Sequence, residues 1–476
     1  MLDKKWIVAK SINQEITARF PEISGLLLQL LWNRGLTEQD KIDEYLNPDW
    51  FKDVPDPYLF NDMDKAVRRV YEAIGKKEVI AVYGDYDADG VCAAVILLDS
   101  LNKLGAKTEY YIPHREKEGY GLNKEAINYL KNKQAGLIIT CDCGIANVAE
   151  VAYASSLGLE VIVTDHHQAQ EKLPPALAIL HGGLKQENYP FKKLSGGGTA
   201  FKFVQGLLRY DGCPLDNKTA EAWEKWLLDL VAISTIADMV PLVGENRTLV
   251  SYGLTVLKKT RRLGLQKLIT EANINLLKFN AQTVSFQIAP RLNAAGRLDH
   301  ANTALALLMS NNEQEAGELA KSISLTNSQR QKLTDEMFNE AKKQIGETSD
   351  DYLIQVYKAD WQLGMVGLVA GKLVQYYNRP ALVLCDNNGK IAGSGRSGVG
   401  DFDLAKSFTN LKKYLLGYGG HKEAAGLSLL KSDLENFLKD LKQAAADHLK
   451  NQDLSPELNI DAELNFSQID WEALAA

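Results

Sequence analysis

The chain has 476 residues, which is too long for one ordinary domain of about 100–200 residues. Its net charge is −7, from 54 basic and 61 acidic residues. This balance argues mildly against a nucleic-acid binder, because phosphate neutralisation needs Lys and Arg, but it does not exclude a locally basic groove. Five Cys without a regular framework fit a reducing cytoplasm. No secretory leader or membrane span is predicted, because Met1–Lys10 carries four charges and the longest apolar run, Leu26–Trp32, is too short.

Residues 1–60 predict a short helical lead-in that ends near Pro55 and Pro57. Beyond it, short apolar runs typical of buried strands alternate with helix-forming segments. The expected strands are Val79–Val82, Leu137–Cys141 and Leu159–Thr164, and the expected helices are Val91–Leu104, Asn123–Lys133 and Asn147–Leu157. This order predicts an α/β fold with a parallel sheet and right-handed crossovers.

Acidic and histidine side chains follow the predicted strands. Asp85, Asp87 and Asp89 alternate after the first strand, and like charges this close raise one another's pKa or recruit a cation. The later strands, and an apolar run that ends at Ala237, lead into a second set: Asp142, Asp165, His166, His167 and Asp238. Because parallel strands end at one edge of the sheet, where ligands bind in open α/β folds, we expect both sets to converge there.

Three other interpretations of Asp85–Gly90 are weaker. A calcium-binding EF-hand loop needs a bidentate Glu at its twelfth position, which is Ile96 here, so that loop is excluded. An aspartyl-phosphate phosphatase places Asp-x-Asp-Gly at a strand end, and Asp87–Gly90 matches this only over a short stretch. A solvated acidic turn that caps the next helix is the plainest alternative, but it does not explain the companion acids and histidines.

The composition of this cluster indicates its chemistry. Several carboxylates with one or two imidazoles suit Mn²⁺ or Mg²⁺ better than zinc, whose structural sites favour closed tetrahedra of Cys and His. The residues are numerous enough for two ions. Two metal ions about 3.5–4 Å apart clamp the attacking and leaving oxygens of a phosphoryl transfer and lower the pKa of a bound water. The expected reaction is metal-assisted hydrolysis of a phosphate ester or anhydride.

The remaining segments predict a connector and a second domain. Ser195–Thr199 precedes a helical run and predicts either an anion site at a helix N-terminus or a loop capped by Thr. From Ser310 to Thr348 the chain is charged and lacks Pro, which predicts one or two long connecting helices. The second domain is expected to contain the strands Tyr352–Tyr357, Ala381–Asp386 and Lys390–Ser394 around the helix Met365–Tyr377. Its Gly-rich stretches predict turns that hold a phosphate together with Arg396 and His421.

The motifs resemble those of the DHH phosphoesterase family. Four family motifs are similar to Val82–Gly90, Asp142, Asp165–His167 and Ile236–Leu242. Ala289–Arg297 is similar to a motif of the family's single-strand-specific 5′→3′ DNA exonucleases, and Gly393–Ser397 and Gly419–Gly426 are similar to its DHH-associated domain. The resemblance implies a parallel-sheet catalytic domain that a long helical connector joins to a smaller α/β DHH-associated domain.

The resemblance also implies a domain layout. Residues 1–60 are the helical lead-in, 61–301 the catalytic domain, 302–350 the connector, 351–455 the substrate-binding DHH-associated domain and 456–476 the start of a truncated OB-fold. Leu458–Leu464 is similar to the first strand of that OB-fold. OB-folds hold single strands by stacking bases on aromatic side chains in a basic groove, so weaker or shorter-range DNA binding is expected from a chain that lacks the rest of it.

Residue roles are implied in the same way. The metal ligands, for two Mn²⁺ or Mg²⁺ ions, are expected among Asp85, Asp87, Asp89, Asp142, His166 and Asp238. Asp165, His166 and His167 form the expected catalytic set, in which His167 faces the scissile phosphate and Asp165 holds a histidine in place. Substrate phosphates are expected at Arg115, Ser394, Arg396 and His421, and the DNA backbone at Arg291 and Arg297.

Two positions depart from the family pattern. Relatives carry a His a few residues before the first Asp, where this chain has Ala81 or Tyr83, so Asp89 is a candidate substitute and the direct ligands among Asp85, Asp87 and Asp89 stay open. Gln362 stands where relatives often have His.

The expected function is a Mn²⁺- or Mg²⁺-dependent, single-strand-specific 5′→3′ DNA exonuclease of DNA repair and recombination. The protein is expected to be a cytoplasmic monomer that acts on single-stranded DNA and does not bind a membrane. A single-strand-binding protein and a helicase are the candidate partners. A phosphodiesterase of cyclic dinucleotides or short oligonucleotides is the first alternative, against which the Ala289–Arg297 motif and the length of the chain argue. A non-catalytic replication scaffold is the second, against which the retained acids and histidines argue.

Overall fold

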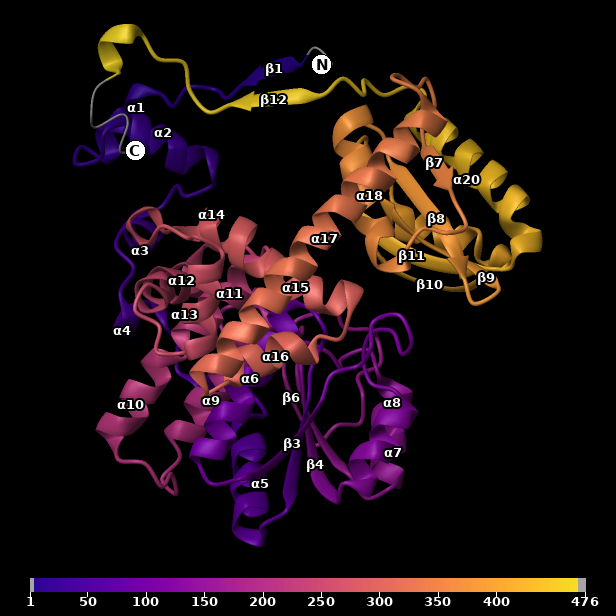
Figure 1. The fold of residues 1–476 in the computed structure, drawn as a ribbon. Helices are drawn as coiled ribbons and strands as arrows, with labels where there is room; N and C mark the ends of the chain where they lie inside the picture. Colours follow the sequence, from indigo (N-terminus) through magenta and orange to yellow (C-terminus); the bar gives the residue numbers. More distant parts are fainter. Residues whose placement is uncertain (1–3, 470–476) are drawn as a thin grey trace. The chain divides into compact units, whose positions relative to one another are not determined.

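Five parallel strands form the sheet of the larger of two compact units in this computed structural model, which describes residues 4–469. Their order is β3-β2-β4-β5-β6 (Figure 1). The bounds are β2 Val79–Tyr83, β3 Lys107–Tyr111, β4 Ala135–Cys141, β5 Glu160–Thr164 and β6 Ala178–Leu180. The larger unit comprises residues 43–329, and the smaller one comprises 1–42 and 330–476. The predicted α/β fold with a parallel sheet is confirmed.

Helices cover both faces of this sheet, as is usual for parallel strands. In β2, Ile80 and Val82 pack with α5, α6 and α9 on one face, whereas Ala81 and Tyr83 pack with α7 and α8 on the other. The helices of the unit are α4 Trp50–Asp53, α5 Met63–Lys76, α6 Ala88–Lys103, α7 Lys124–Asn132, α8 Val148–Ser156, α9 Gly196–Leu208, α10 Asn217–Trp226, α11 Leu228–Ala237, α12 Gly244–Leu257, α13 Leu263–Glu271, α14 Ala281–Thr283, α15 Ala289–Leu298 and α16 Asn302–Met309.

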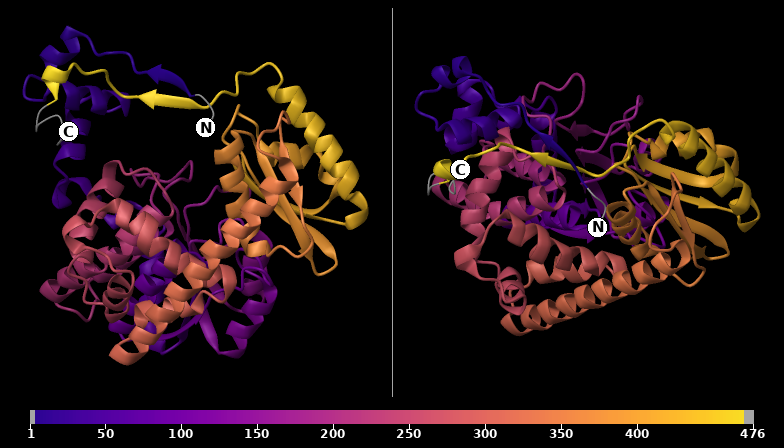
Figure 2. Two further views of the ribbon diagram at one scale, coloured as in Figure 1. Left: turned by 45° about the horizontal axis from the view of Figure 1, so that its top comes forward. Right: turned by 90° about the horizontal axis from the view of Figure 1, so that it is seen from above.

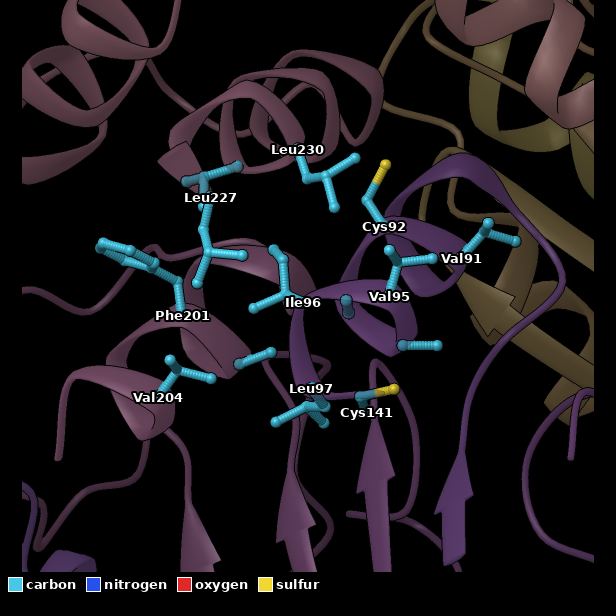
Figure 3. Close-up of a cluster of buried hydrophobic side chains, with 14 of the residues drawn as sticks. Val91, Cys92, Val95, Ile96, Leu97, Cys141, Phe201, Val204, Leu227 and Leu230 are labelled. Atoms are coloured by element: carbon cyan, nitrogen blue, oxygen red, sulfur yellow. The ribbon is translucent and has the colours of Figure 1, made fainter. Parts of the chain in front are cut away.

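Helix α6 forms the centre of the larger core. It is buried on all sides, which fits a helix that is apolar all round rather than along one stripe. Figure 3 shows its side chains, among them Val95 and Ile96, surrounded by Phe201 of α9, Leu230 of α11 and Leu227 at the start of α11. The helix begins where the Asp87 side chain accepts hydrogen bonds from two backbone N–H groups of its first turn. The acidic loop before α6 is therefore fixed to the most deeply buried helix of the unit.

The smaller unit has a mixed five-stranded sheet with the order β10-β11-β9-β8-β7, in which only β7 and β8 are parallel. Its elements are β7 Ile354–Tyr357, α18 Leu363–Tyr377, β8 Ala381–Asn387, β9 Lys390–Arg396, α19 Leu404–Asn410, β10 Leu415–His421, β11 Ala424–Leu429 and α20 Leu434–Leu449. The expectation of Gly-rich turns is met only at Lys422 and Glu423, between β10 and β11. Gly393–Ser397 lies largely in β9, and Gly419–Gly426 forms the end of the β10–β11 hairpin, where Gly419 pairs with Gly426.

The connector is one continuous helix, α17, from Glu313 to Ile345 (Figure 2). At the other end of the sequence, β1 (Lys5–Val8) pairs in parallel with β12 (Glu457–Ile460), and α1 (Gln14–Arg19), α2 (Gly25–Asn33) and α3 (Gln39–Leu46) follow β1. The expected strand Leu458–Leu464 overlaps β12 over residues 458–460. Residues 470–476 of the expected OB-fold segment lie outside the described residues.

No helix within residues 4–469 has the length and apolar character needed to cross a membrane.

A buried ion pair joins α9 to α12. The Lys202 Nζ lies 3.0 Å from Glu245 Oε1 and donates a hydrogen bond of 2.7 Å to the Pro55 carbonyl oxygen. The Tyr189 hydroxyl donates to Glu245 Oε2 at 2.6 Å. Burial lowers the pKa of Lys202 and raises that of Glu245, and the opposite charge of each partner counteracts both effects. Each charge in this core therefore depends on the other.

Lys202→Met is expected to lower the free energy of unfolding by about 3–5 kcal/mol, because it leaves the Glu245 carboxylate buried without a cation. The double variant Lys202→Met/Glu245→Gln should recover part of that loss, since Gln carries no charge and keeps an oxygen for Tyr189. Urea unfolding followed by circular dichroism measures both effects. A double variant no more stable than Lys202→Met would contradict this account.

Candidate metal centre

The carboxyl ends of β2, β4 and β5 lie at one edge of the sheet, and the expected site residues follow them directly. Asp142 comes one residue after β4, and Asp165 and His166 come directly after β5. His166 Nε2 lies 3.0 Å from Asp142 Oδ1, 3.6 Å from Asp238 Oδ2 and 3.7 Å from Asp89 Oδ2. The structure therefore brings the predicted acids and histidines together, with Asp238 provided by the end of helix α11.

Three overlapping groups of side chains are close enough to share a cation. They are Asp85, Asp87 and Asp142; Asp142, His166 and His167; and Asp89, His166 and Asp238. Asp142 and His166 each belong to two groups. The carboxylate of Asp142 has two oxygens and could serve two neighbouring ions, whereas the single lone pair of His166 Nε2 would bind one. The groups contain every residue that the sequence analysis named as a metal ligand.

The three carboxylates of the acidic loop have different surroundings. Asp85 is buried, and its Oδ1 has no hydrogen-bond partner. Asp87 uses Oδ1 to accept from the backbone N–H groups of Asp89 and Gly90 at 2.9 and 3.0 Å. A buried carboxylate oxygen without a partner is costly, so Asp85 is the acid of this loop with the greatest need for a cation.

Asp89 is held by the protein itself. Its Oδ2 accepts from Gly196 N–H at 2.8 Å, and its Oδ1 accepts from Gly197 N–H at 2.8 Å and from the Ser234 hydroxyl at 2.5 Å. The Gly-rich start of α9 is therefore an anion site, as one of its two interpretations predicted, and the anion is the carboxylate of Asp89. The alternative interpretation, a loop capped by Thr, is not observed, because Ser195 is the N-cap residue of α9.

Close packing explains the glycines at this helix start. A Cβ at Gly196 would lie 2.5 Å from Asp142 Oδ1, so no side chain fits between α9 and the acid. Asp142 itself has a φ of 61°, a left-handed conformation that is costly for a residue with a side chain. Such strain is maintained only where the surrounding structure fixes it, and here Asp142 N–H donates to the Thr164 carbonyl oxygen at 3.0 Å.

A second set of hydrogen bonds holds the histidines. Asp165 Oδ1 lies 2.8 Å from His167 Nδ1, and its Oδ2 accepts from Ile145 N–H at 2.9 Å. The Tyr120 hydroxyl lies 3.0 Å from His167 Nδ1 and donates to the Asp142 carbonyl oxygen at 3.0 Å. His181 Nε2 lies 2.7 Å from the His167 carbonyl oxygen. These contacts orient the His167 ring and leave its Nε2 for another partner.

The electrostatics of the site reflect crowded, buried acids. Burial and the neighbouring carboxylates raise the pKa of Asp85 and Asp142 well above the usual range and that of Asp238 to about 8. Burial disfavours the charged form of His167, but its bond to Asp165 and the nearby acids outweigh this and raise its pKa to about 9. For Asp165 the balance is reversed: burial acts to raise its pKa, and the bond to His167 lowers it below the usual value. His167 and Asp165 are thus paired beside acids whose charged form a bound cation would favour.

The expected phosphate-binding residues lie in both units. In the larger unit, the Arg115 guanidinium lies 5.0 Å from the centre of the Tyr86 ring, and its charge acts to lower the pKa of Asp85. Arg291 and Arg297 belong to α15, where Arg291 Nη1 donates to the Gln287 carbonyl oxygen at 2.6 Å.

In the smaller unit, three candidates occupy neighbouring strands. Arg396 of β9 donates through Nη1 to the Ser394 hydroxyl at 2.7 Å. Ala424 of β11 pairs with Arg396 on one side and with His421 of β10 on the other. The candidates Ser394, Arg396 and His421 thus lie at one end of the second sheet. Their role in substrate binding stays a prediction. Gln362 is the N-cap residue of α18, without a side-chain cap.

Several residues of the site carried no pattern in the sequence. Ser234 and His181 are single polar residues within or after apolar runs, and Tyr120 lies in a loop. Their partners are distant in sequence, so only the folded chain reveals them. The sequence shows Gly196 and Gly197 as part of a Gly-rich helix start, but it does not show that this start binds the Asp89 carboxylate.

Comparison with known proteins agrees with this geometry. A model described as "DHH family, N-terminal domain" matches residues 79–235, and one described as "DHHA1 domain" matches 349–447. The single-stranded-DNA-specific exonuclease RecJ of Bacillus subtilis is 40% identical over 98% of this chain and 57% of its own length. That of Haemophilus influenzae is 34% identical over 94% of this chain and 79% of its own length. The chain belongs to the RecJ family.

Solved RecJ structures contain metal ions. The crystal structure of Thermus thermophilus RecJ with Mn²⁺ matches with a TM-score of 0.80 at 29% identity, over 96% of this chain and 64% of that one. The structure of the same protein with Mg²⁺ matches with a TM-score of 0.75 at 28% identity, over 97% of this chain and 63% of that one. This chain thus spans less than two thirds of the length of the Bacillus and Thermus RecJ proteins.

The side chains present here fit Mn²⁺ or Mg²⁺. Oxygen donors predominate in the three candidate groups, with imidazole nitrogens in two of them, and such mixed oxygen-rich sites suit these ions. The orphaned Asp85 Oδ1 supplies an independent reason for a cation at this edge. The expectation of Mn²⁺ or Mg²⁺ as cofactor is confirmed by the RecJ structures and by these groups.

Asp85→Asn and Asp89→Asn should have opposite effects on stability in the presence of chelator. Asp85→Asn removes a buried, repelled carboxylate and should leave the free energy of unfolding unchanged or higher. Asp89→Asn places an NH₂ group against donors and should lower it by about 1–3 kcal/mol. Urea unfolding in EDTA compares the two. Equal destabilisation would refute the distinct surroundings inferred for these acids.

Metal binding should also depend on pH. Because the folded pKa of Asp238 lies near 8 and its ordinary value is 3.8, the metal-free fold binds more protons than the unfolded chain between these values. Its free energy of unfolding should therefore fall as pH rises from about 4 to 8. Mn²⁺ displaces those protons, so the rise in Tm that it causes should be larger at pH 8 than at pH 6. Calorimetry with Mn²⁺ or EDTA measures this rise, and Asp238→Asn should reduce its pH dependence.

Proposed function

We propose that this chain is a metal-dependent exonuclease that hydrolyses single-stranded DNA from its 5′ end and acts in DNA repair and recombination. The observation that carries the proposal is the convergence of Asp85, Asp87, Asp142, His166 and Asp238 at one sheet edge, where groups of three side chains can share a cation. The named activity of the RecJ relatives supports it. Bound ions at this edge would supply charge neutralisation at the phosphate and would lower the pKa of an attacking water.

The protein's own residues hold and charge the site in this proposal. Asp165 holds His167 through Nδ1, so the opposite ring nitrogen is the atom that faces the scissile phosphate. The bond to Asp165 and the nearby acids raise the pKa of His167 to about 9, and a protonated imidazole would suit the stabilisation of negative charge or proton donation to the leaving oxygen. Asp142, which belongs to two groups of candidate ligands, would bind two neighbouring ions, and His166 would bind one of them.

Substrate binding is assigned to basic residues of both units. Arg115 lies near the acidic loop, and Arg291 and Arg297 of α15 are candidates for the DNA backbone. In the smaller unit, Ser394, Arg396 and His421 are candidates for a terminal phosphate, with the Arg396 guanidinium as a planar donor. The proposed layout assigns catalysis to residues 61–301, substrate binding to 351–455 and connection to 302–350, with 1–60 as lead-in and 456–476 as the start of an OB-fold.

The proposed setting follows from the substrate. A cytoplasmic monomer would reach single-stranded DNA where a helicase exposes it and where a single-strand-binding protein coats it. Co-purification with those two kinds of protein and the mass of the particle in solution are direct measurements of these points.

The decisive experiment compares three substrates: a 5′-phosphorylated single strand, the same strand in a duplex, and dinucleotides. The single strand has about 30 nucleotides, enough to span several binding subsites. With Mn²⁺, the wild type should release mononucleotides from the 5′ end of the single strand and leave the duplex intact. Asp142→Ala should lower the rate by more than about a hundredfold, because loss of outer partners alone costs up to that much. Glu171→Ala removes an exposed acid and serves as the matched control.

Each alternative function predicts a different result. Dinucleotide cleavage without cleavage of the long strand would favour a phosphodiesterase of small substrates. Cleavage that survives EDTA, or that survives Asp142→Ala, would refute the metal-dependent mechanism. Mn²⁺ binding without any hydrolysis would favour a scaffold.

A further inference from the structure

Helix α15 contacts the acidic loop through a side chain that the proposed function does not use. Asn293 Oδ1 accepts a hydrogen bond from the backbone N–H of Ala88 at 2.7 Å, across a separation of 205 residues. Ala88 is the first residue of α6 and lies between Asp87 and Asp89. The bond therefore holds the backbone at the point that sets the positions of both acids.

One turn further along α15, Gly296 faces the same loop. A Cβ at this position would press into the Tyr86 carbonyl oxygen, so the helix approaches the loop more closely than any other residue would permit. Asn293 and Gly296 are three residues apart and share one face of the helix. A π-helical turn, η3 (Val284–Ile288), comes directly before α15, and such turns change which face of a helix is presented.

Side chains accept from three N–H groups at the start of α6. Asp87 Oδ1 accepts from Asp89 and Gly90, and Asn293 accepts from Ala88 N–H. The N–H groups of the first helical turn have no partner within the helix, so these three depend on the side chains of Asp87 and Asn293.

We propose that Asn293 is a positioning residue of the metal centre: through Ala88 N–H it fixes the backbone that carries Asp85, Asp87 and Asp89. The Ala289–Arg297 segment then has two tasks, since its arginines are candidates for the DNA backbone while Asn293 and Gly296 set the geometry of the acids. The inference deepens the proposed function and rests on its metal centre. It differs from a DNA-binding role because it predicts a change in metal affinity without any DNA.

The test measures Mn²⁺ binding to the full chain by the electron paramagnetic resonance of free Mn²⁺. Asn293→Ala removes the acceptor and should raise the Kd for Mn²⁺ about tenfold or more, as outer partners of metal sites do. Asn293→Asp keeps an acceptor oxygen at the same place and should stay within about threefold of the wild type. Gln287→Ala, at an exposed position of the preceding turn, is the matched control and should bind Mn²⁺ as the wild type does.

A kinetic measurement separates positioning from DNA contact. At saturating single-stranded DNA, high Mn²⁺ should restore most of the rate of Asn293→Ala, whereas Arg297→Ala should change KM for DNA and leave Mn²⁺ affinity unaltered. If Asn293→Ala does not fold, Asn293→Gln displaces the same oxygen by one methylene and should give the same loss of Mn²⁺ affinity.

Two results would overturn the inference: wild-type Mn²⁺ affinity in Asn293→Ala, or an equal loss of affinity in Asn293→Ala and Asn293→Asp. Either result leaves the proposed function standing, provided the wild type binds Mn²⁺ and cleaves DNA. A wild type that binds no Mn²⁺ refutes the proposed function itself.

Discussion

The carboxylate of Asp89, bound by the Gly196 and Gly197 N–H groups and the Ser234 hydroxyl, is the contact on which the rest of the site depends. It joins the start of α6 to the start of α9 and to the middle of α11. These helices provide or support most other members of the cluster: Asp238 ends α11, and Asp142 packs against Gly196. The carboxylate of Asp89 thus has a structural role in addition to its place in a candidate ligand group, and this separates it from Asp85, whose Oδ1 has no partner.

Several buried acids at one sheet edge repel one another and lower the stability of the fold, and some of them are compensated by neighbouring groups. Asp165 is compensated by His167 and by Ile145 N–H, and Asp87 by the helix that it caps. Asp85, Asp142 and Asp238 are the acids whose pKa burial and mutual repulsion raise most clearly. All three of these acids belong to the candidate ligand groups, which is the pattern expected where stability is sacrificed for a binding site.

The sequence allowed part of the larger unit to be predicted, because β2, β4 and β5 are short apolar runs that lead into an acid. Their ends therefore sufficed to place Asp85, Asp142 and Asp165 at one edge. The strands β3 and β6 lack this pattern and were not predicted.

The partners of Asp89 could not be predicted, since Gly196 and Ser234 lie 107 and 145 residues from it in sequence. The Ser-Thr pair in the apolar run of α11 has no periodicity that marks Ser234 as functional.

The same limit explains the error in the smaller unit. Glycine is uncommon in strands and typical of turns, so Gly393–Ser397 and Gly419–Gly426 indicated turns where the structure has mostly strand. Strand pairing is a non-local property, and β11 forms because β9 offers it a partner over six consecutive residue pairs. Local composition thus missed most of these strand residues, whereas the alternation of apolar residues in β7 and the continuous apolar run of β8 predicted the right element.

The pairing of β1 with β12 has a consequence for the order of folding. Lys5 pairs with Glu457, so two strands from opposite ends of the sequence complete each other, and closing such a loop from an unfolded chain would cost on the order of 5 kcal/mol. During synthesis β1 has no partner until β12 has left the ribosome. The larger unit, whose strands are all close in sequence and lie between these two, can fold in the meantime. A strand made before the larger unit is thus paired only after that unit is complete.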